Sequence, residues 1–417
     1  QARTLSLQAG ATSATYAGAI SNLSTNTLAF TVDAGGTLTV SGIISSGTNS
    51  SGFEKTGAGT LILTGNNTYT GDTTINTGTL EIGSGSTTGS LSSSSAITNN
   101  ASLVFNRSND LTVSNTIGGT GNLTKSGAGT LTLSGSSNYS GTTTISVGAL
   151  RATHANALGS TAAGTTVTSG AALELSGGIS IGAEALSLSG TGISSGGALR
   201  NISGDNSYAG AITLAAATLI NSDSGNLTLS GIMSGSSALT KNGSGRLTLS
   251  ATNTYTGGTT VNGGTLAFTD GTTSAIGNGT ITINNGSTLS FTKSRFEDQS
   301  IIFGSSGGGN LTTSTTMRFG GSTITTTGGA TNFMNGSLID VGSPTFNVAD
   351  GTDDVDLPVS NSMNRMGFTK SGAGKLLLTS ASNNLQANTI TINAGALEIG
   401  ATGRLLNGGG SWTGNMT

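Results

Sequence analysis

The densest group of ionisable side chains in this sequence is a run of aspartates that ends at residue 356. Its four carboxylates belong to Asp350, Asp353, Asp354 and Asp356. Because Ca²⁺ takes roughly six to eight oxygen ligands from a flexible loop, the run is a candidate calcium site. It lacks the alternating aspartate spacing of an EF-hand loop, and no glutamate follows it. We therefore favour a solvated acidic loop, with Ca²⁺ binding as the alternative and no other cofactor expected.

A polysaccharide-cleaving enzyme would need several carboxylates on one open face, or carboxylates combined with Ca²⁺ and an arginine. The only group in the sequence that offers these side chains is Asp353, Asp354, Asp356 and Arg365. Their closeness is what a single loop would give, and the other acidic residues are scattered singly. We expect no enzymatic activity and keep a polysaccharide-degrading enzyme as a minor alternative.

Serine-nucleophile motifs of the form Gly-x-Ser-x-Gly occur at 178–182, 192–196 and 304–308. Glycine accounts for 69 of the 417 residues and serine is similarly common, so such matches arise by chance. They also lack the strand, turn and helix that surround the nucleophile of a hydrolase. The single histidine, His154, excludes any site that needs two imidazoles, and the absence of cysteine excludes disulfides and thiolate metal sites.

The composition excludes further classes of protein. The chain has only two prolines, which rules out a collagen pattern. Only 8% of the residues are charged and the net charge is −3, which argues against nucleic acid or an anionic membrane as a partner. No stretch approaches the roughly 20 consecutive apolar residues of a membrane-spanning helix, so we expect no membrane insertion by this segment.

Short runs in which apolar and small polar residues alternate, such as 60–64, predict half-buried β-strands. Helical periodicity is missing almost everywhere, so the chain is predicted to be all-β. A longer frame also recurs, in which Lys-x-Gly-x-Gly-x-Leu-x-Leu precedes Tyr-x-Gly-x-Thr and Gly-x-Leu. Its copies lie at about 55–80, 123–150, 239–266 and, without the tyrosine, 368–399. The residues that mark it are Lys55, Tyr69, Gly71, Lys125, Tyr139, Gly141, Lys241, Tyr255, Gly257 and Lys370.

All five tyrosines have a glycine two residues later, including Tyr16 and Tyr208 in two copies that keep only the tyrosine half. Because the repeated lysines and tyrosines lie beside glycines, we favour structural roles for both at the corners of a coil. Two functional alternatives remain. The lysines would form a basic stripe for acidic glycans, and the tyrosines would be exposed platforms on which sugars stack.

A unit of a few short strands with one apolar face cannot close a core alone, so successive units must stack. Each strand then pairs with its equivalent in the next rung, about 4.8 Å away. We therefore predict a single continuous parallel β-helix, or β-solenoid, over residues 1–417 with roughly 17–20 rungs. Residues 291–368 depart from the frame and hold seven of the eleven phenylalanines. This segment is predicted to form wider rungs and to carry the acidic loop.

The recurring frame resembles the autotransporter-associated β-strand repeat, which is also called the passenger-associated transport repeat. The resemblance covers roughly a quarter of the chain. It implies a right-handed β-helix that is secreted and exposed on the surface of a Gram-negative bacterium, usually as the passenger of a type V secretion system.

We therefore expect an extracellular, surface-displayed, non-enzymatic rod that acts as a structural scaffold or an adhesin-like passenger. The alternative is a subunit of a self-assembling extracellular filament or sheath, because the ends of a β-helix carry unpaired strand edges. The expected partners are a second copy of the chain, or glycans and proteins on host or bacterial surfaces.

Overall fold

The computed structural model describes most of the chain and divides it into two compact units, Gln1–Ala211 and Ile212–Thr417. The residues outside the description are 1–2, 22–25, 48–49, 94, 270–276, 278, 285, 293, 297–298, 305–307, 320, 330, 381–382, 385–388, 401–404, 407–411 and 414–417. The two units are described separately below, and one continuous β-helix over 1–417 stays a prediction.

Over its described residues, the first unit consists of short strands and one turn of 3-10 helix. Its strands are β1 (Arg3–Leu7), β2 (Ser13–Tyr16), β3 (Ile20–Ser21), β4 (Leu28–Val32), β5 (Thr37–Val40), β6 (Ile44–Ser45), β7 (Phe53–Thr56), β8 (Thr60–Leu63), β9 (Thr73–Ile75), β10 (Thr79–Ser86), β11 (Ile97–Asn99), β12 (Ser102–Arg107), β13 (Leu111–Val113), β14 (Ile117–Gly118), β15 (Asn122–Lys125), β16 (Thr130–Leu133), β17 (Thr143–Ile145), β18 (Ala149–Ala152), β19 (Gly164–Val167), β20 (Ala172–Ser176), β21 (Ser180–Ile181), β22 (Ala185–Gly190), β23 (Leu199–Ser203) and β24 (Asn206–Tyr208). The helical turn is η1 (Ile193–Ser195).

The second unit is built from strands alone over its described residues. They are β25 (Ile212–Ser222), β26 (Asn226–Leu229), β27 (Met233–Ser234), β28 (Leu239–Asn242), β29 (Arg246–Leu249), β30 (Thr259–Val261), β31 (Thr265–Phe268), β32 (Ile281–Ile283), β33 (Thr288–Phe291), β34 (Ser294–Phe296), β35 (Ser300–Phe303), β36 (Asn310–Phe319), β37 (Thr323–Thr326), β38 (Phe333–Gly342), β39 (Thr345–Val348), β40 (Leu357–Val359), β41 (Ser362–Met366), β42 (Phe368–Ser371), β43 (Lys375–Leu378), β44 (Asn383–Asn384), β45 (Ile390–Ile392), β46 (Ala396–Ile399), β47 (Leu405–Leu406) and β48 (Trp412–Thr413).

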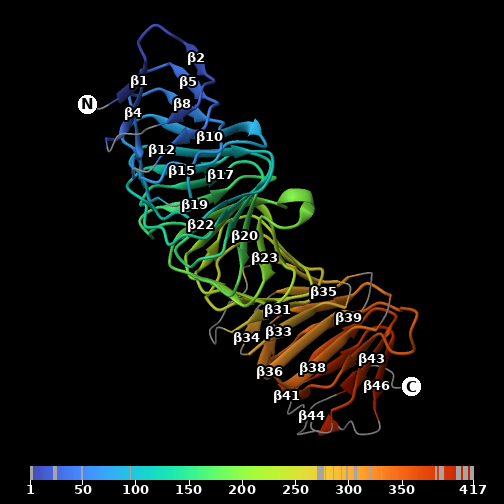
Figure 1. Cartoon of the computed structure of the whole chain (residues 1–417). Coiled ribbons are helices and arrows are strands. Elements are labelled where there is room, and N and C mark those ends of the chain that lie inside the picture. The colour runs from blue at the N-terminus through green and yellow to red at the C-terminus, as the bar shows by residue number, and fades with distance from the viewer. Residues whose placement is uncertain are drawn as a thin grey trace. The chain divides into compact units, whose positions relative to one another are not determined.

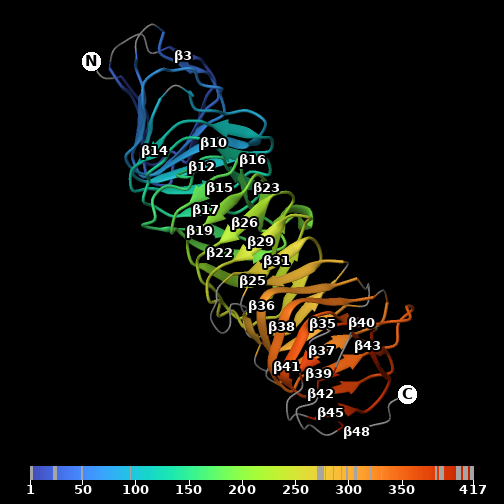
Figure 2. The ribbon, with the colours of Figure 1, turned by 90° about the horizontal axis from the view of Figure 1, so that it is seen from below.

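The pairings between the described strands are parallel, and each joins a strand to an equivalent strand one turn away. In the first unit, one face of the coil stacks Leu131 on Leu150, Leu150 on Leu173, and Leu173 on Leu199. In the second unit, Thr259, Ile281 and Ile301 follow one another in the same way. Figures 1 and 2 show these rungs stacked within each unit.

The all-β prediction and the parallel β-solenoid are therefore confirmed. Over the described residues the chain makes about 16 turns, close to the predicted 17–20. The turns are of unequal length. Leu131 and Leu150 are 19 residues apart, whereas Leu173 and Leu199 are 26 apart.

The core lies inside the coil and follows the alternation seen in the sequence. In β8, Leu61 and Leu63 are fully buried, while Thr60 before them and Ile62 between them are only partly covered. Each inward side chain rests on the equivalent side chain of the next rung, so burial of apolar area stabilises the stack as a whole. No helix in the described part of the chain is long and apolar enough to cross a membrane.

Aromatic side chains fill much of the interior in the segment that departs from the repeat. Phe291 stacks on Phe268 with 5.3 Å between the ring centres. Phe346 meets Phe368 edge to face at 5.5 Å. Strands β36 and β38 are ten residues each, longer than most strands of this unit.

Candidate functional site

The four repeated lysines point into the solenoid, and each side chain is at most 2% exposed. Lys55 Nζ donates to the carbonyls of Thr56 at 2.8 Å, Gly57 at 2.6 Å and Thr77 at 3.3 Å. Lys241 and Lys370 repeat this arrangement, and Lys125 bonds to Gly127 and Val147. These residues therefore satisfy turn carbonyls of two successive rungs rather than form an exposed basic stripe.

Desolvation has an electrostatic consequence for these lysines. Burial lowers the pKa of Lys55, Lys125 and Lys241 to about 8, because an ammonium group is disfavoured away from water. The pKa of Lys370 is lowered for the same reason. Gly78 shows why glycine recurs here, since it has a φ of +73° and an added Cβ would lie 2.8 Å from Lys55 Nζ.

The repeated tyrosines are also interior residues. The hydroxyls of Tyr69, Tyr139 and Tyr255 lie 2.5 to 2.6 Å from the hydroxyl of the threonine four residues later. These threonines are Thr73, Thr143 and Thr259. The tyrosines therefore cannot be platforms on which sugars stack, because their rings are buried. Tyr16, in a diverged copy, is 39% exposed.

The glycine of the Tyr-x-Gly pair lies where successive rungs approach most closely. An added Cβ at Gly71 would lie 2.2 Å from the backbone of Gly52. An added Cβ at Gly141 or Gly257 would likewise lie 2.2 Å from a backbone atom of the preceding rung. No side chain fits there, so the glycine, tyrosine and threonine form one structural unit. The sequence frame already included this threonine, but it did not indicate that its hydroxyl pairs with the tyrosine hydroxyl.

One diverged copy departs from this unit. Tyr208 is fully buried, but the residue four positions later in the sequence is Ile212 instead of threonine. Its hydroxyl has no hydrogen-bond partner among the described residues. Nearby, the 4% exposed Glu184 accepts a 2.6 Å hydrogen bond from Thr165. Burial raises the pKa of Glu184 to about 7. Burial also raises the pKa of Tyr208, and the negative charge of Glu184 raises it further.

The structure does not gather the four aspartates of the acidic run around one point. Asp353 accepts hydrogen bonds from the backbone and hydroxyl of Thr331 at 2.7 and 2.6 Å, which lower its pKa. Asp356 is buried and accepts from the backbone of Gly351 and Lys375, each at 2.7 Å.

The remaining two aspartates of the run, Asp350 and Asp354, are exposed. Among the described residues, no three carboxylates or imidazoles come close enough to hold one metal ion. The side chain of Arg365, which would complete a polysaccharide-cleaving group, lies outside the described part. Asp356 therefore has a structural role in closing the loop, and the sequence pattern gave no sign that it faces inward.

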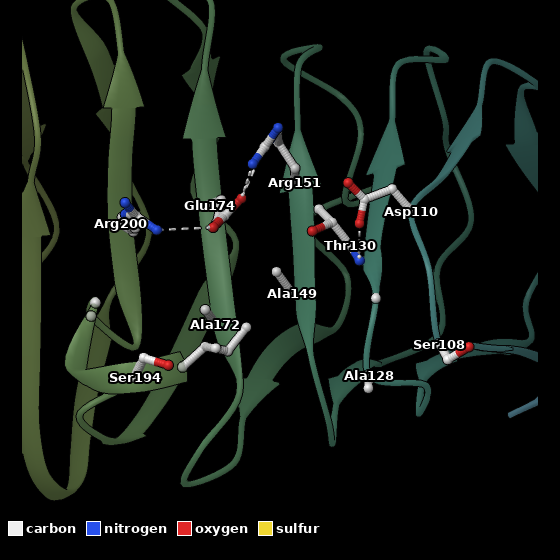
Figure 3. A pocket seen from close by; sticks show the side chains of 14 residues that line it. Ser108, Asp110, Ala128, Thr130, Ala149, Arg151, Ala172, Glu174, Ser194 and Arg200 are labelled. Atoms are coloured by element: carbon white, nitrogen blue, oxygen red, sulfur yellow. Dashed lines mark hydrogen bonds and ion pairs between the residues drawn. The ribbon is translucent and has the colours of Figure 1, made fainter. Parts of the chain in front are cut away.

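A polar groove of about 510 Å³ lies on the outer surface of the first unit, over β16, β18 and β20. Its floor follows one outward-facing row, in which Thr130 stacks on Ala149 and Ala149 on Ala172. The turn that contains η1 covers one end, where Ser194 lies beside the groove (Figure 3). Ser108 and Asp110 line the other end, and Asp110 accepts a 2.9 Å hydrogen bond from the backbone of Thr130.

The neighbouring outward row carries three charged side chains on successive rungs. Arg151 pairs in register with Glu174, and Glu174 with Arg200 (Figure 3). Arg151 Nε and Nη2 lie 2.8 and 2.7 Å from Glu174 Oε2. Arg200 Nη1 lies 3.6 Å from Glu174 Oε1. The two guanidinium side chains are about one-third exposed, whereas the Glu174 side chain is 6% exposed.

Sequence reasoning missed this charged row. Arg151 and Glu174 are 23 residues apart and Glu174 and Arg200 are 26 apart, which are single turns of unequal length. A search for charges one turn apart could have found the pair, but only with the length of each turn known. His154, the single histidine, accepts a hydrogen bond from the backbone of Asn156 and does not line the groove.

A comparison with protein families finds that parts of this chain match the passenger-associated transport repeat. The match covers residues 53–82, 123–152, 201–220, 239–268 and 368–399. The chain carries passenger-associated transport repeats. The copy at 201–220 contains Tyr208, so the lone tyrosine half noted in the sequence belongs to a fifth copy.

One curated relative shares part of this sequence. Over 75 residues the chain is 49% identical to the Adhesin BmaC autotransporter of Brucella suis biovar 1 (strain 1330). The matched stretch covers 18% of this chain and 2% of that protein, so the chain spans a small part of the length of this relative. No solved structure matches the chain.

The transport repeat explains the interior of the solenoid but not the groove. Arg151 occupies a repeat position that holds Glu81, Ala267 or Glu398 in three other copies. Glu174 and the turn that contains η1 lie between the matched repeats. The charged row is therefore not a requirement of the repeat.

Proposed function

We propose that this chain is a segment of an autotransporter passenger and acts at the cell surface as a non-enzymatic, adhesin-like scaffold. The observation that carries the proposal is the set of five transport repeats, together with the relative that is named an adhesin. The repeat supports secretion to the cell surface, where a passenger of this kind is displayed.

The physical properties of the chain support the same role. A parallel coil needs no disulfide to hold it, because each rung stabilises the next through main-chain hydrogen bonds and a continuous core. Within that core, the lysines and the tyrosine–threonine pairs satisfy polar groups at the turns. The outward positions remain available for recognition, since stability rests on the inward ones.

Surface display provides the test. The chain would be fused to the translocator of another autotransporter and produced in a non-adherent Gram-negative host. We expect intact cells to expose the chain to added protease or antibody and to attach to epithelial cells better than cells with the translocator alone. Exposure of the chain without any gain in attachment would overturn the adhesin-like role. A chain that stays inaccessible on intact cells would overturn the display.

A further inference from the structure

We propose that the groove over β16, β18 and β20 binds an acidic oligosaccharide and that Arg151 and Arg200 recognise a carboxylate on it. This inference deepens the proposed function, because it names the chemistry that an adhesin-like surface would recognise. The binding itself involves the folded chain alone and does not require display on a cell.

The charge of the row favours an anion. Two guanidinium groups surround the carboxylate of Glu174, so this row carries a local net positive charge, whereas the second carboxylate of the groove, Asp110, lies at its other end. Glu174 is almost completely buried between them, while the arginine heads remain partly exposed at the edge of the groove. A guanidinium presents its donors in a planar fork that matches a carboxylate, and partial burial strengthens that interaction.

The shape of the groove fits an extended and shallow ligand. Its floor is made of the small side chains Thr130, Ala149 and Ala172 on neighbouring strands. Neighbouring strands lie about 4.8 Å apart, so the three strands and the adjoining β23 span about 14 Å. A volume of about 510 Å³ lies within the range of small-molecule sites.

The lining favours a saccharide over an acidic peptide. Ile193 is the one large apolar side chain among the residues that line the groove, so there is no deep apolar pocket for a peptide side chain. The ends instead offer the hydroxyls of Ser108 and Ser194 and the carboxylate of Asp110. These groups can exchange hydrogen bonds with the hydroxyls of a sugar, and the 40% exposed Ile193 can cover the apolar face of a ring.

The turn at the end of the groove has an unfavourable backbone. Ser194 has φ and ψ of 48° and 35°, and Ser195 has a φ of 58°. Left-handed conformations are disfavoured for residues with a Cβ, and such strain gathers at ligand-binding positions. Here the strained turn brings Ile193 and Ser194 to the groove, which is consistent with a binding role for it.

The test uses the purified whole chain and three soluble probes of similar length: trigalacturonate, neutral galactotriose and triglutamate. We expect saturable binding of trigalacturonate by isothermal titration calorimetry, weaker binding at higher salt, and much weaker binding of the other two probes. Absence of saturable trigalacturonate binding would overturn the proposal. Equal binding of triglutamate would also overturn it and would indicate a site for acidic peptides.

Variants of the charged row sharpen this test. Arg151→Gln is expected to weaken trigalacturonate binding about tenfold, and Arg151→Lys less, because lysine lacks the planar fork. Glu174→Gln is expected to strengthen binding, since it removes the competing carboxylate. Arg246→Gln, the same change on a strand of the second unit, is the matched control and should leave the affinity unchanged.

Two outcomes with these variants contradict the proposal directly. One is an Arg151→Gln chain that binds as tightly as the wild type, and the other is a Glu174→Gln chain that binds less tightly. Thermal melting of each variant shows whether it is folded. If folding fails for Arg151→Gln, the double variant Arg151→Gln/Glu174→Gln is compared with Glu174→Gln alone, because it leaves no charge of the pair buried alone. The double variant is expected to bind trigalacturonate less tightly than Glu174→Gln, and equal binding by the two would overturn the proposal.

The two proposals can fail separately. Purified chain that binds trigalacturonate while displayed chain does not promote attachment would overturn the adhesin-like role and leave the site standing. Attachment that is unchanged in the Arg151→Gln variant, together with no binding of the probe, would overturn the site and leave the adhesin-like role standing.

Discussion

The hydroxyl of Tyr139 lies 2.6 Å from Oγ1 of Thr143, and both side chains are buried within one turn of the solenoid. The same pair occurs in two other repeats, whereas the copy with Tyr208 lacks it. This difference between copies allows the contribution of the hydrogen bond to be measured inside a single chain.

Tyr139→Phe is expected to lower the free energy of unfolding by about 1 kcal/mol, because the Thr143 hydroxyl loses a buried partner. Tyr208→Phe removes a hydroxyl without a described partner and is expected to be neutral or stabilising. Denaturant unfolding of the two variants gives the comparison. Equal destabilisation by both changes would show that the hydrogen bond to threonine contributes nothing specific.

Lys241→Met keeps an unbranched side chain but removes the donor that bonds to the carbonyls of Asn242, Gly243 and Gly263. We expect a loss of about 2 kcal/mol in the free energy of unfolding, since turn carbonyls would be left without a partner. The control is Lys375→Met, at a lysine that is about one-third exposed and paired with Glu398 at 3.1 Å; this change should cost less than about 1 kcal/mol. Similar losses in the two variants would contradict the buried role of Lys241.

Glu184 makes the stability of the chain depend on pH. Burial raises its pKa to about 7 from the usual 4.5, so between these values the folded state binds more protons than the unfolded state. Stability from this group is therefore complete at acidic pH and falls as the pH rises through 7.

Glu184→Gln is expected to raise the melting temperature at pH 8 and to change it much less at pH 5. Thermal melting at the two values measures the difference, with Glu54→Gln at a half-exposed position of the same unit as the control. A variant whose melting temperature shifts equally at both pH values would rule out Glu184 as the source of the pH dependence.

Gly141→Ala is expected to destabilise the chain strongly, because the new Cβ would lie 2.2 Å from the carbonyl oxygen of Gly121. Gly182→Ala is the matched control, since its added Cβ would meet nothing closer than the Thr161 methyl group at 3.6 Å. The melting temperatures of the two variants are compared, and that of Gly141→Ala is expected to be the lower. Tolerance of alanine at both positions would mean that the rungs can separate to accommodate it.

Asp356→Ala is expected to destabilise the 350–356 loop, because it removes both acceptors for the backbone of Gly351 and Lys375. The loss is expected to be about 1–3 kcal/mol and to be the same with added Ca²⁺ and with a chelator. A melting temperature of the wild-type chain that rises with Ca²⁺ would instead support a calcium site in this loop.

The amino-acid sequence is enough to predict the all-β class, the parallel coil and the positions of the repeated lysines, tyrosines and glycines. These features follow from the alternation of apolar and small polar residues and from the repeated frame. Both can be recognised in the amino-acid sequence. Even the inward direction of Lys55 is consistent with that alternation, because it lies two residues after the buried Phe53 in β7.

The contacts between side chains of different turns become visible only in the folded chain. Asp356 turns inward while Asp354, two residues earlier, is exposed, because the loop closes on backbone donors from Gly351 and Lys375. Arg151, Glu174 and Arg200 come together because the turns between them hold 23 and 26 residues. The loops between the strands differ in length, while the strands keep their register from rung to rung. The separation of two residues along the chain therefore does not show whether they are neighbours on successive rungs.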